Sequence, residues 1–411
     1  MKNLIDNIKF WIRKKYTKIV NSIAFYPAFI AFTFLIVSLL LIRFDFSETG
    51  AALKDEFSWL TIKDAATARN IIAVIAGGIL SLTVFSFSMV MIVLNQAASQ
   101  MSNRVLNKLI GNRFQQVVLG NYIGTIMFAL FLLSTIRDID SGIQIPSIST
   151  YTLILTAIID IFLFIYFLHY ITQSVKYEVI IQRIYKVTNS AMREMCQEEL
   201  KLDTKPKENF NYEILTPKAS VYEGIDVKEL LKLCCEENCV VQLQYGPGTF
   251  LLKDVLIIRV NKQLSEETIK KIQHALLLNT DETITNNFLY GFRQLTEVAI
   301  KALSPGINDP GTASLALRVL FQLYAYRVCH YPDDVIEDED KKPRIYIENL
   351  DFETIFKASL LPIWDYGKND RIIQHEIKSL IDNFLSLHPN EVMQHFMKSV
   401  DEEIENINKK N

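Results

Sequence analysis

The chain has 411 residues, which exceeds the length of one ordinary domain and predicts two or three domains. Half of the residues are hydrophobic, yet the mean hydropathy is only +0.16, which indicates a very apolar part beside a polar part. The net charge of −3 gives no global signal of nucleic-acid binding.

Residues 1–22 predict a cytosolic or interfacial amphipathic helix, because apolar and basic residues alternate there at helical spacing. Four apolar runs follow, at 23–42, 71–94, 117–136 and 151–171. Each is close to the roughly 20 residues that a helix needs to cross a bilayer core. We therefore expect a four-helix transmembrane domain at 23–171. The first run lacks a convincing cleavage site, so we interpret it as an anchor rather than a signal peptide.

Basic residues mark the side of the membrane predicted to be cytosolic. They cluster in the N-terminal arm, in the loop after the second run and after the fourth run. The loop between the third and fourth runs instead holds Arg137 against Asp138 and Asp140. Since cytosolic loops carry an excess of Lys and Arg, both termini are expected in the cytosol.

The polar part of the chain begins at residue 172. Residues 172–216 predict a helical stalk, continuing the fourth span, and a linker. Residues 217–262 predict a small mixed alpha/beta domain whose one helix is capped by Asp226. Residues 263–411 predict a helical cytosolic domain whose first helix is capped by Ser265. The expected fold class is thus an α-helical polytopic membrane protein with four transmembrane helices and a C-terminal α+β cytosolic region.

The stretch ALSPGINDPGTAS, residues 302–314, ends one predicted helix and begins the next. Asp309 is the expected N-cap and Pro310 the first helical residue, because the residue before a proline is driven out of the helical region. A ligand anion at the free N–H groups of the new helix is the alternative interpretation. The residues that form this turn, or that contact such a ligand, are Ser304, Pro305, Gly306, Asn308, Asp309, Pro310 and Thr312.

Polar residues inside the apolar runs are the candidates for lining a pore. Positions 81, 88, 95 and 102 recur every seven residues, so they share one face of a helix. Ser99 lies near the cytosolic end of the same run, and Asp160 is an acid in the fourth run. The candidates for lining a pore are therefore Ser81, Ser88, Asn95, Ser99, Ser102 and Asp160. The serine and asparagine face either lines a path in a symmetric assembly or packs helix on helix. Asp160 is either a cation or proton site, or a protonated acid bonded to a Ser or Thr of a neighbouring helix.

Four stretches carry a resemblance to a known family: 84–106, 117–133, 167–177 and 302–314. In these stretches the chain resembles the bacterial predicted membrane proteins of domain-of-unknown-function family 2254, over nearly its full length. Gly311 departs from the family pattern, which often has a large apolar residue there. The resemblance implies four spans, a cytosolic C-terminal part and a place in the bacterial plasma (inner) membrane, and it brings no established activity.

Three classes of function stay open on the sequence. The first is an oligomeric ion channel or small-solute pore with a cytosolic regulatory region. The second is a membrane-anchored sensor or scaffold whose cytosolic region binds a ligand or partner. An enzyme is the third and weakest, because the residues predict no catalytic group, no cofactor and no metal, and the five cysteines fit reduced thiols. The expected partners are the lipid bilayer, further copies of the chain, and ions or small solutes, with no nucleic acid.

Overall fold

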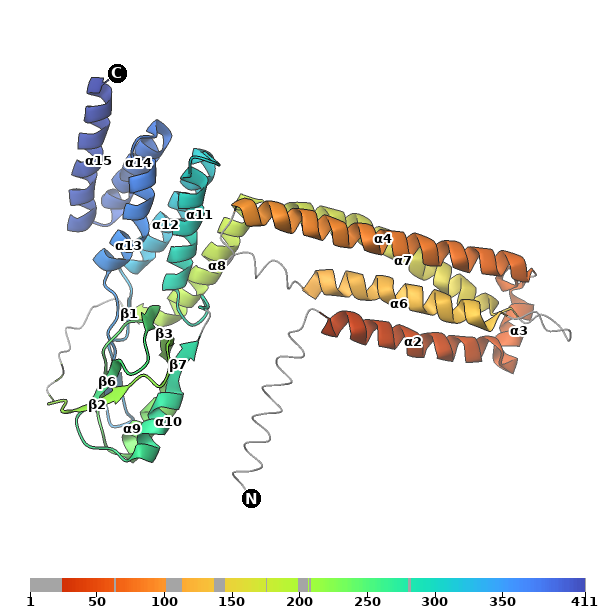
Figure 1. The fold of residues 1–411 in the computed structure, drawn as a ribbon, viewed down its shortest axis with the longest axis horizontal. Helices are drawn as coiled ribbons and strands as arrows, with labels where there is room; N and C mark the ends of the chain where they lie inside the picture. The colour runs from red at the N-terminus through yellow and green to blue at the C-terminus, as the bar shows by residue number, and fades with distance from the viewer. Residues whose placement is uncertain are drawn as a thin grey trace. The chain divides into compact units, whose positions relative to one another are not determined.

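The computed structural model describes residues 24–62, 64–100, 113–136, 145–174, 176–198, 206, 208–279 and 282–410, without the side chains of 58, 96–100, 198 and 407–410. The chain folds into two compact units, the first ending at Lys176 and the second beginning at Tyr177. Figure 1 shows the helices and strands of both units.

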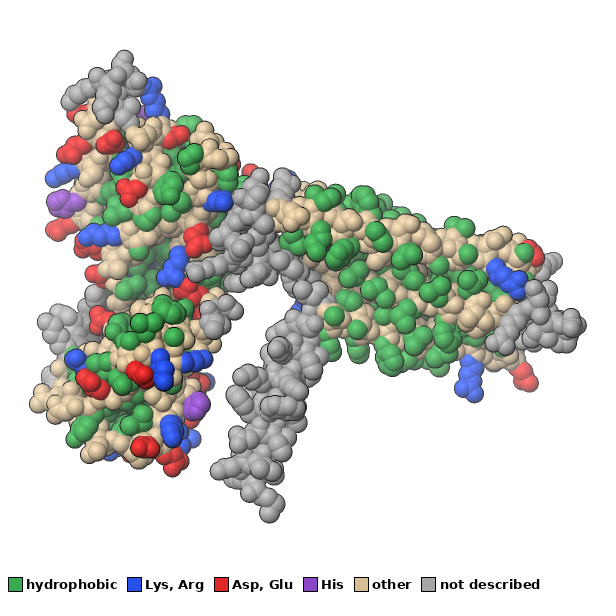
Figure 2. Space-filling view, in the orientation of Figure 1, with side chains coloured by type: hydrophobic (Ala, Val, Ile, Leu, Met, Phe, Trp, Pro, Cys, Tyr) green, Lys and Arg blue, Asp and Glu red, His purple; other side chains and the backbone are tan. Residues whose placement is uncertain are grey.

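Four long apolar helices form the first unit. They are α2 (Phe25–Asp45), α4 (Ala65–Gln100), α6 (Arg113–Thr135) and α7 (Ser147–Ser174), with the short α3 (Glu48–Glu56) and the 3-10 turn η1 (Ser58–Leu60) between α2 and α4. Each long helix has the length and composition to cross a membrane. Figure 2 shows hydrophobic side chains over most of the visible face of these helices. The four spans predicted from the sequence are confirmed.

Helix α6 is the most buried of the four, with 44% of its apolar window buried against 17% for α2 and for α4. Two glycines four residues apart bring α2 close to it. A Cβ added at Gly120 would lie 2.9 Å from Ile30, and one added at Gly124 would lie 2.6 Å from the ring of Phe34. Small residues at this spacing allow membrane helices to approach closely, and α2 runs beside α6 in Figure 1.

One end of this unit is held by a buried carboxylate. Asp45, at the end of α2, is fully buried and lies 3.0 Å from the ammonium group of Lys54 on α3. The N–H of Ser149 in the first turn of α7 donates to the same carboxylate at 2.7 Å. Asp45 therefore ties together α2, α3 and the beginning of α7.

The second unit combines helices and short strands. Its helices are α8 (Tyr177–Met195), α9 (Val227–Glu236), α10 (Glu266–Ala275), α11 (Leu289–Leu303), α12 (Pro310–Arg327), α13 (Phe352–Gly367), α14 (Arg371–Leu387) and α15 (Glu391–Lys410). Its strands are β1 (Cys196–Glu198), β2 (Tyr212–Leu215), β3 (Ser220–Ile225), β4 (Val241–Leu243), β5 (Thr249–Leu251), β6 (Leu256–Val260), β7 (Leu276–Asn279), β8 (Tyr331–Pro332), β9 (Val335–Glu337) and β10 (Pro343–Tyr346). This mixture agrees with the α+β class expected for the C-terminal region.

Three sheets order these strands. The largest has the order β2-β6-β4-β10-β9, and the others are β5-β3-β7 and β1-β8. Strand β10 lies parallel to β4, with Ile345 opposite Val241. Strands β7 to β10 fall inside 263–411, which we expected to be helical. They have two to four residues each, too few to leave a periodic pattern of their own. Strands β7, β8 and β10 pair with strands much earlier in the chain, whereas β9 pairs with the neighbouring β10.

Helix α8 also differs from the continuous stalk that we expected. Helix α7 ends at Ser174 and α8 begins at Tyr177, so the helical pattern is divided between two helices. One face of α8 is buried within the second unit, where Thr188 fits against Gly291 of α11 so closely that a Cβ at Gly291 would lie 1.8 Å from the threonine hydroxyl. The expected caps are confirmed: Asp226 accepts from the N–H of Glu229, and Ser265 accepts from that of Thr268.

Candidate functional site

Asp160 lies near the middle of α7 and is turned toward the inside of the four-helix unit. Asp160 is only 1% exposed, whereas its chain neighbours Ile159 and Ile161 are each 50% exposed. Helical geometry therefore points the acid inward and the apolar side chains outward. This is the arrangement that a carboxyl group needs in a bilayer, because contact with lipid would be costly.

Two hydroxyl groups of α6 lie near this acid, and a third, from α4, lies next to one of them. Tyr122 and Thr125 of α6 are fully buried, and Ser86 of α4 is 4% exposed. Tyr122 and Thr125 are three residues apart, so they share one face of α6. Thr125 lies beside the Asp160 carboxyl group, and Tyr122 interacts with both Ser86 and Asp160. We call Ser86, Tyr122, Thr125 and Asp160 the Asp160 cluster.

The oxygens of the Asp160 cluster are not used by the rest of the described chain. Both Asp160 carboxyl oxygens and the three hydroxyl oxygens are buried, and among the residues the structure describes no hydrogen bond joins them to a residue outside the cluster, within which Thr125 lies next to Asp160 and Ser86 next to Tyr122. Other hydroxyls on these helices behave differently. Those of Thr83 and Thr156 donate to carbonyls of their own helix at 2.7 and 2.6 Å. Because buried polar atoms are destabilising unless they gain partners, the Asp160 cluster is a candidate site for a ligand.

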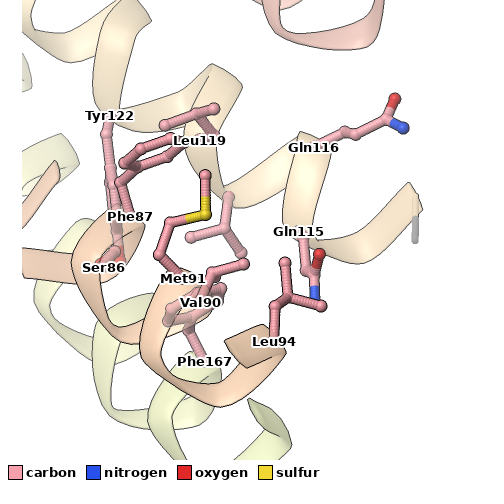
Figure 3. A pocket seen from close by; sticks show the side chains of 11 residues that line it. Ser86, Phe87, Val90, Met91, Leu94, Gln115, Gln116, Leu119, Tyr122 and Phe167 are labelled. Carbon is pink, nitrogen blue, oxygen red and sulfur yellow. The ribbon is translucent and has the colours of Figure 1, made fainter. Parts of the chain in front are cut away.

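A cavity of about 210 Å³ reaches the Asp160 cluster from one side. Figure 3 shows Ser86 and Tyr122 at one side of this cavity and Gln115 and Gln116 at the opposite side. Apolar side chains of α4, α6 and α7 make up most of the wall between them, among them Met91, Leu119 and Phe167. Two members of the Asp160 cluster, Ser86 and Tyr122, thus line a largely apolar cavity.

Beyond the cluster, toward the other end of the helices, the interior is apolar. Ile72 of α4, Phe128 and Leu132 of α6 and Leu153 of α7 pack there in one hydrophobic core. All four are at most 3% exposed. Within one subunit this core separates the Asp160 cluster from the end that Asp45 holds.

The pore-lining candidates on α4 lie on a different face from Ser86. Ser81 and Ser88 are exposed, and their hydroxyls donate to the carbonyls of Gly77 and Val84 at 2.9 Å each. Asn95 is also exposed. Ser102 and the side chain of Ser99 lie outside what the structure describes. The structure therefore joins Asp160 with Ser86 and not with the heptad of polar residues.

Ser86, Tyr122 and Thr125 were not predicted as site residues from the sequence. A signal existed for Tyr122 and Thr125, since polar residues three apart in an apolar run share a face. Ser86 lies outside the seven-residue repeat, so the repeat predicted functional residues on the opposite face of α4. Only the packing of three helices identifies the inward-facing polar residues.

The turn at 302–314 is a separate feature of the second unit. Asp309 accepts from the N–H of Thr312 at 3.1 Å and from its hydroxyl at 2.6 Å, and Pro310 is the first residue of α12. The N–H of Asp309 donates to the carbonyl of Ala302 at 2.8 Å. Both carboxylate oxygens are thus engaged within the turn. The residue with left-handed backbone in this turn is Asn308, with φ of 48°, and not Gly306.

Comparison with known proteins identifies the family of the chain. A family model described as "Predicted membrane protein (DUF2254)" matches residues 20–383. The chain belongs to this family. Two relatives are "Uncharacterized protein Rv1290c" of Mycobacterium tuberculosis (strain ATCC 25618 / H37Rv) and "Uncharacterized protein Mb1321c" of Mycobacterium bovis. Each is 22% identical over 328 residues, which cover 76% of this chain and 63% of the relative.

The chain therefore spans less than two thirds of the length of these relatives. No solved structure matches it. The family and the four long apolar helices together make this an integral membrane protein.

Proposed function

We propose that this protein is an ion channel or small-solute pore that works as a homo-oligomer. Asp160 carries this proposal. An ionisable side chain inside a membrane helix is costly and marks an ion or proton pathway. Here the acid is 1% exposed, Thr125 and Tyr122 of a neighbouring helix lie near it, and Tyr122 also contacts Ser86 of a third helix.

A complete path across the membrane needs more than one subunit. The cavity ends at the Asp160 cluster, and the apolar core around Phe128 and Leu132 lies beyond it. The outward face of α4 supports assembly with further copies. It presents Ser81, Ser88 and Asn95, and a Cβ at Gly77 would meet no atom within 4 Å. A helix of a second copy has room to approach there.

The orientation proposed for the channel follows the basic residues. Both termini face the cytosol of a bacterium, and the protein spans its plasma membrane several times. The second unit then lies on the cytosolic side, where it regulates the pore.

A bulky substitution on the outward face of α4 tests the path between subunits. Ser88→Trp is expected to reduce ion flux into liposomes while the assembly keeps its size on a sizing column. Phe162→Trp is the matched control, because it adds the same ring at a 67% exposed position of α7. If Ser88→Trp instead breaks the assembly, and what still assembles conducts normally, the face is a packing seam.

A sensor or scaffold is the second candidate function. Phe250 and Leu252, in and next to β5, are each 63% exposed, and Leu215 of β2 is 41% exposed. The hydroxyl of Thr216, which follows Leu215, donates to the carbonyl of Leu252 at 2.6 Å. These apolar side chains therefore form an exposed patch, a feature typical of protein-binding surfaces. Phe250→Ser would abolish partner binding under this alternative, and would leave ion flux unchanged under either.

A further inference from the structure

We infer that the Asp160 cluster binds one dehydrated monovalent metal cation. This deepens the proposed ion passage by naming the class of ion that contacts the site. Every potential ligand is an oxygen: two of the Asp160 carboxyl group and one each of Ser86, Tyr122 and Thr125. Oxygen donors of this kind suit hard metal cations.

The three helices supply the donors from different directions. Ser86 projects from α4, Tyr122 and Thr125 from α6, and Asp160 from α7. All four residues are at least 96% buried, so the protein itself replaces the hydration shell of an ion at this place. The same burial makes each unpartnered oxygen costly, and a cation gains from all of them at once.

Charge selects the valence. Asp160 is the one carboxylate of the cluster, and its neighbours Thr125, Tyr122 and Ser86 are neutral hydroxyls. Within the described chain no Lys, Arg or His forms an ion pair with Asp160. A cation of charge +1 is therefore fully compensated. A divalent cation would leave a buried positive charge, which is expensive in a medium of low dielectric constant.

Access is from one side. The cavity lined by Gln115 and Leu94 reaches Ser86 and Tyr122, whereas the apolar core around Leu132 and Leu153 lies behind Asp160. An ion in the cavity meets Ser86 and Tyr122 first, and we expect it to reach Asp160 past these two residues. A proton is the competing occupant, and it would neutralise Asp160 without using the oxygen of Ser86, which lies next to Tyr122.

Thermal unfolding of the full chain in detergent tests this inference, with Na⁺ as the probe and choline keeping the ionic strength constant. A ligand that binds the folded state stabilises it as its concentration rises. The Tm of the wild type is expected to rise with Na⁺ in a saturable manner at constant pH. Asp160→Asn should lose this response. Thr125→Val should raise the half-saturating Na⁺ concentration by about tenfold, because it removes one contact to a charged ligand.

Thr156→Val is the matched control, since its hydroxyl bonds its own helix and it should titrate like the wild type. A Tm that does not change with the concentration of Na⁺ or K⁺ overturns the inference. A rise in Tm with Na⁺ that Asp160→Asn retains overturns it as well. A Tm that depends on pH through Asp160 and not on the metal ion assigns the site to a proton. A stronger response to Ca²⁺ than to Na⁺ contradicts the valence. This experiment measures binding and not flux. Saturable Na⁺ binding in a protein that conducts no ions would contradict the channel proposal and leave the cation site standing.

Discussion

At the scale of single residues, Asp309 is a carboxylate whose two oxygens both form hydrogen bonds that stabilise the fold. Its two oxygens accept from the N–H and the hydroxyl of Thr312, which fixes the first turn of α12. Such a cap satisfies a backbone donor that would otherwise have no partner at a helix beginning. The turn interpretation therefore accounts for Asp309 without a ligand.

Replacing Asp309 measures this role. Asp309→Ala is expected to lower the free energy of unfolding by about 1 kcal/mol, because the cap of α12 is lost. Asp309→Asn keeps an accepting oxygen and should stay close to the wild type. Denaturant unfolding of the second unit, followed by circular dichroism, reports both. Full stability in Asp309→Ala together with lost ion flux would reassign the residue to a ligand site.

Some site residues could be read from the sequence and others could not. Asp160 was evident, because a carboxyl group in an apolar run must face inward, toward a cavity or a partner. Ser86, Tyr122 and Thr125 were not, because neutral hydroxyls are common in membrane helices and most bond their own helix, as Thr83 and Thr156 do. Choosing among them requires knowing which faces of three helices meet.

At the scale of elements, long and short segments were not equally predictable. The four spans were found because their runs are long and strongly apolar. Strand β10 has four residues and gains its place in the sheet from β4, about a hundred positions earlier in the chain, so only the tertiary fold defines it. The break between α7 and α8 was missed because helical periodicity continues across it.

The contact between α6 and α2 gives a prediction for an element pair. Gly124→Ala is expected to destabilise the first unit by roughly 1–3 kcal/mol, because the added Cβ would lie 2.6 Å from the Phe34 ring. Gly78→Ala is the matched control on α4, where a Cβ meets nothing within 4 Å. The Tm of each variant in detergent checks this. Equal losses at both glycines would contradict the close approach of α2 and α6.

At the scale of the whole molecule, the orientation in the membrane is the first prediction to check. Asp55 on α3 and Ser386 on α14 are both exposed, so a cysteine at either place can react. The exposed native Cys235 and Cys329 are first replaced by serine. In intact spheroplasts, an impermeant maleimide should label Asp55→Cys at once, and Ser386→Cys only after the membrane is opened. Labelling in the reverse order would place the termini outside.

Ion passage itself is tested most directly by recording currents from the purified full-length protein in a planar lipid bilayer. Discrete current steps are expected from the wild type in a solution of NaCl. Asp160→Asn should lower the unitary conductance, because it removes the one negative charge of the Asp160 cluster. A folded wild-type protein that gives no current at any voltage or salt concentration, or currents that Asp160→Asn leaves unchanged, would contradict the account.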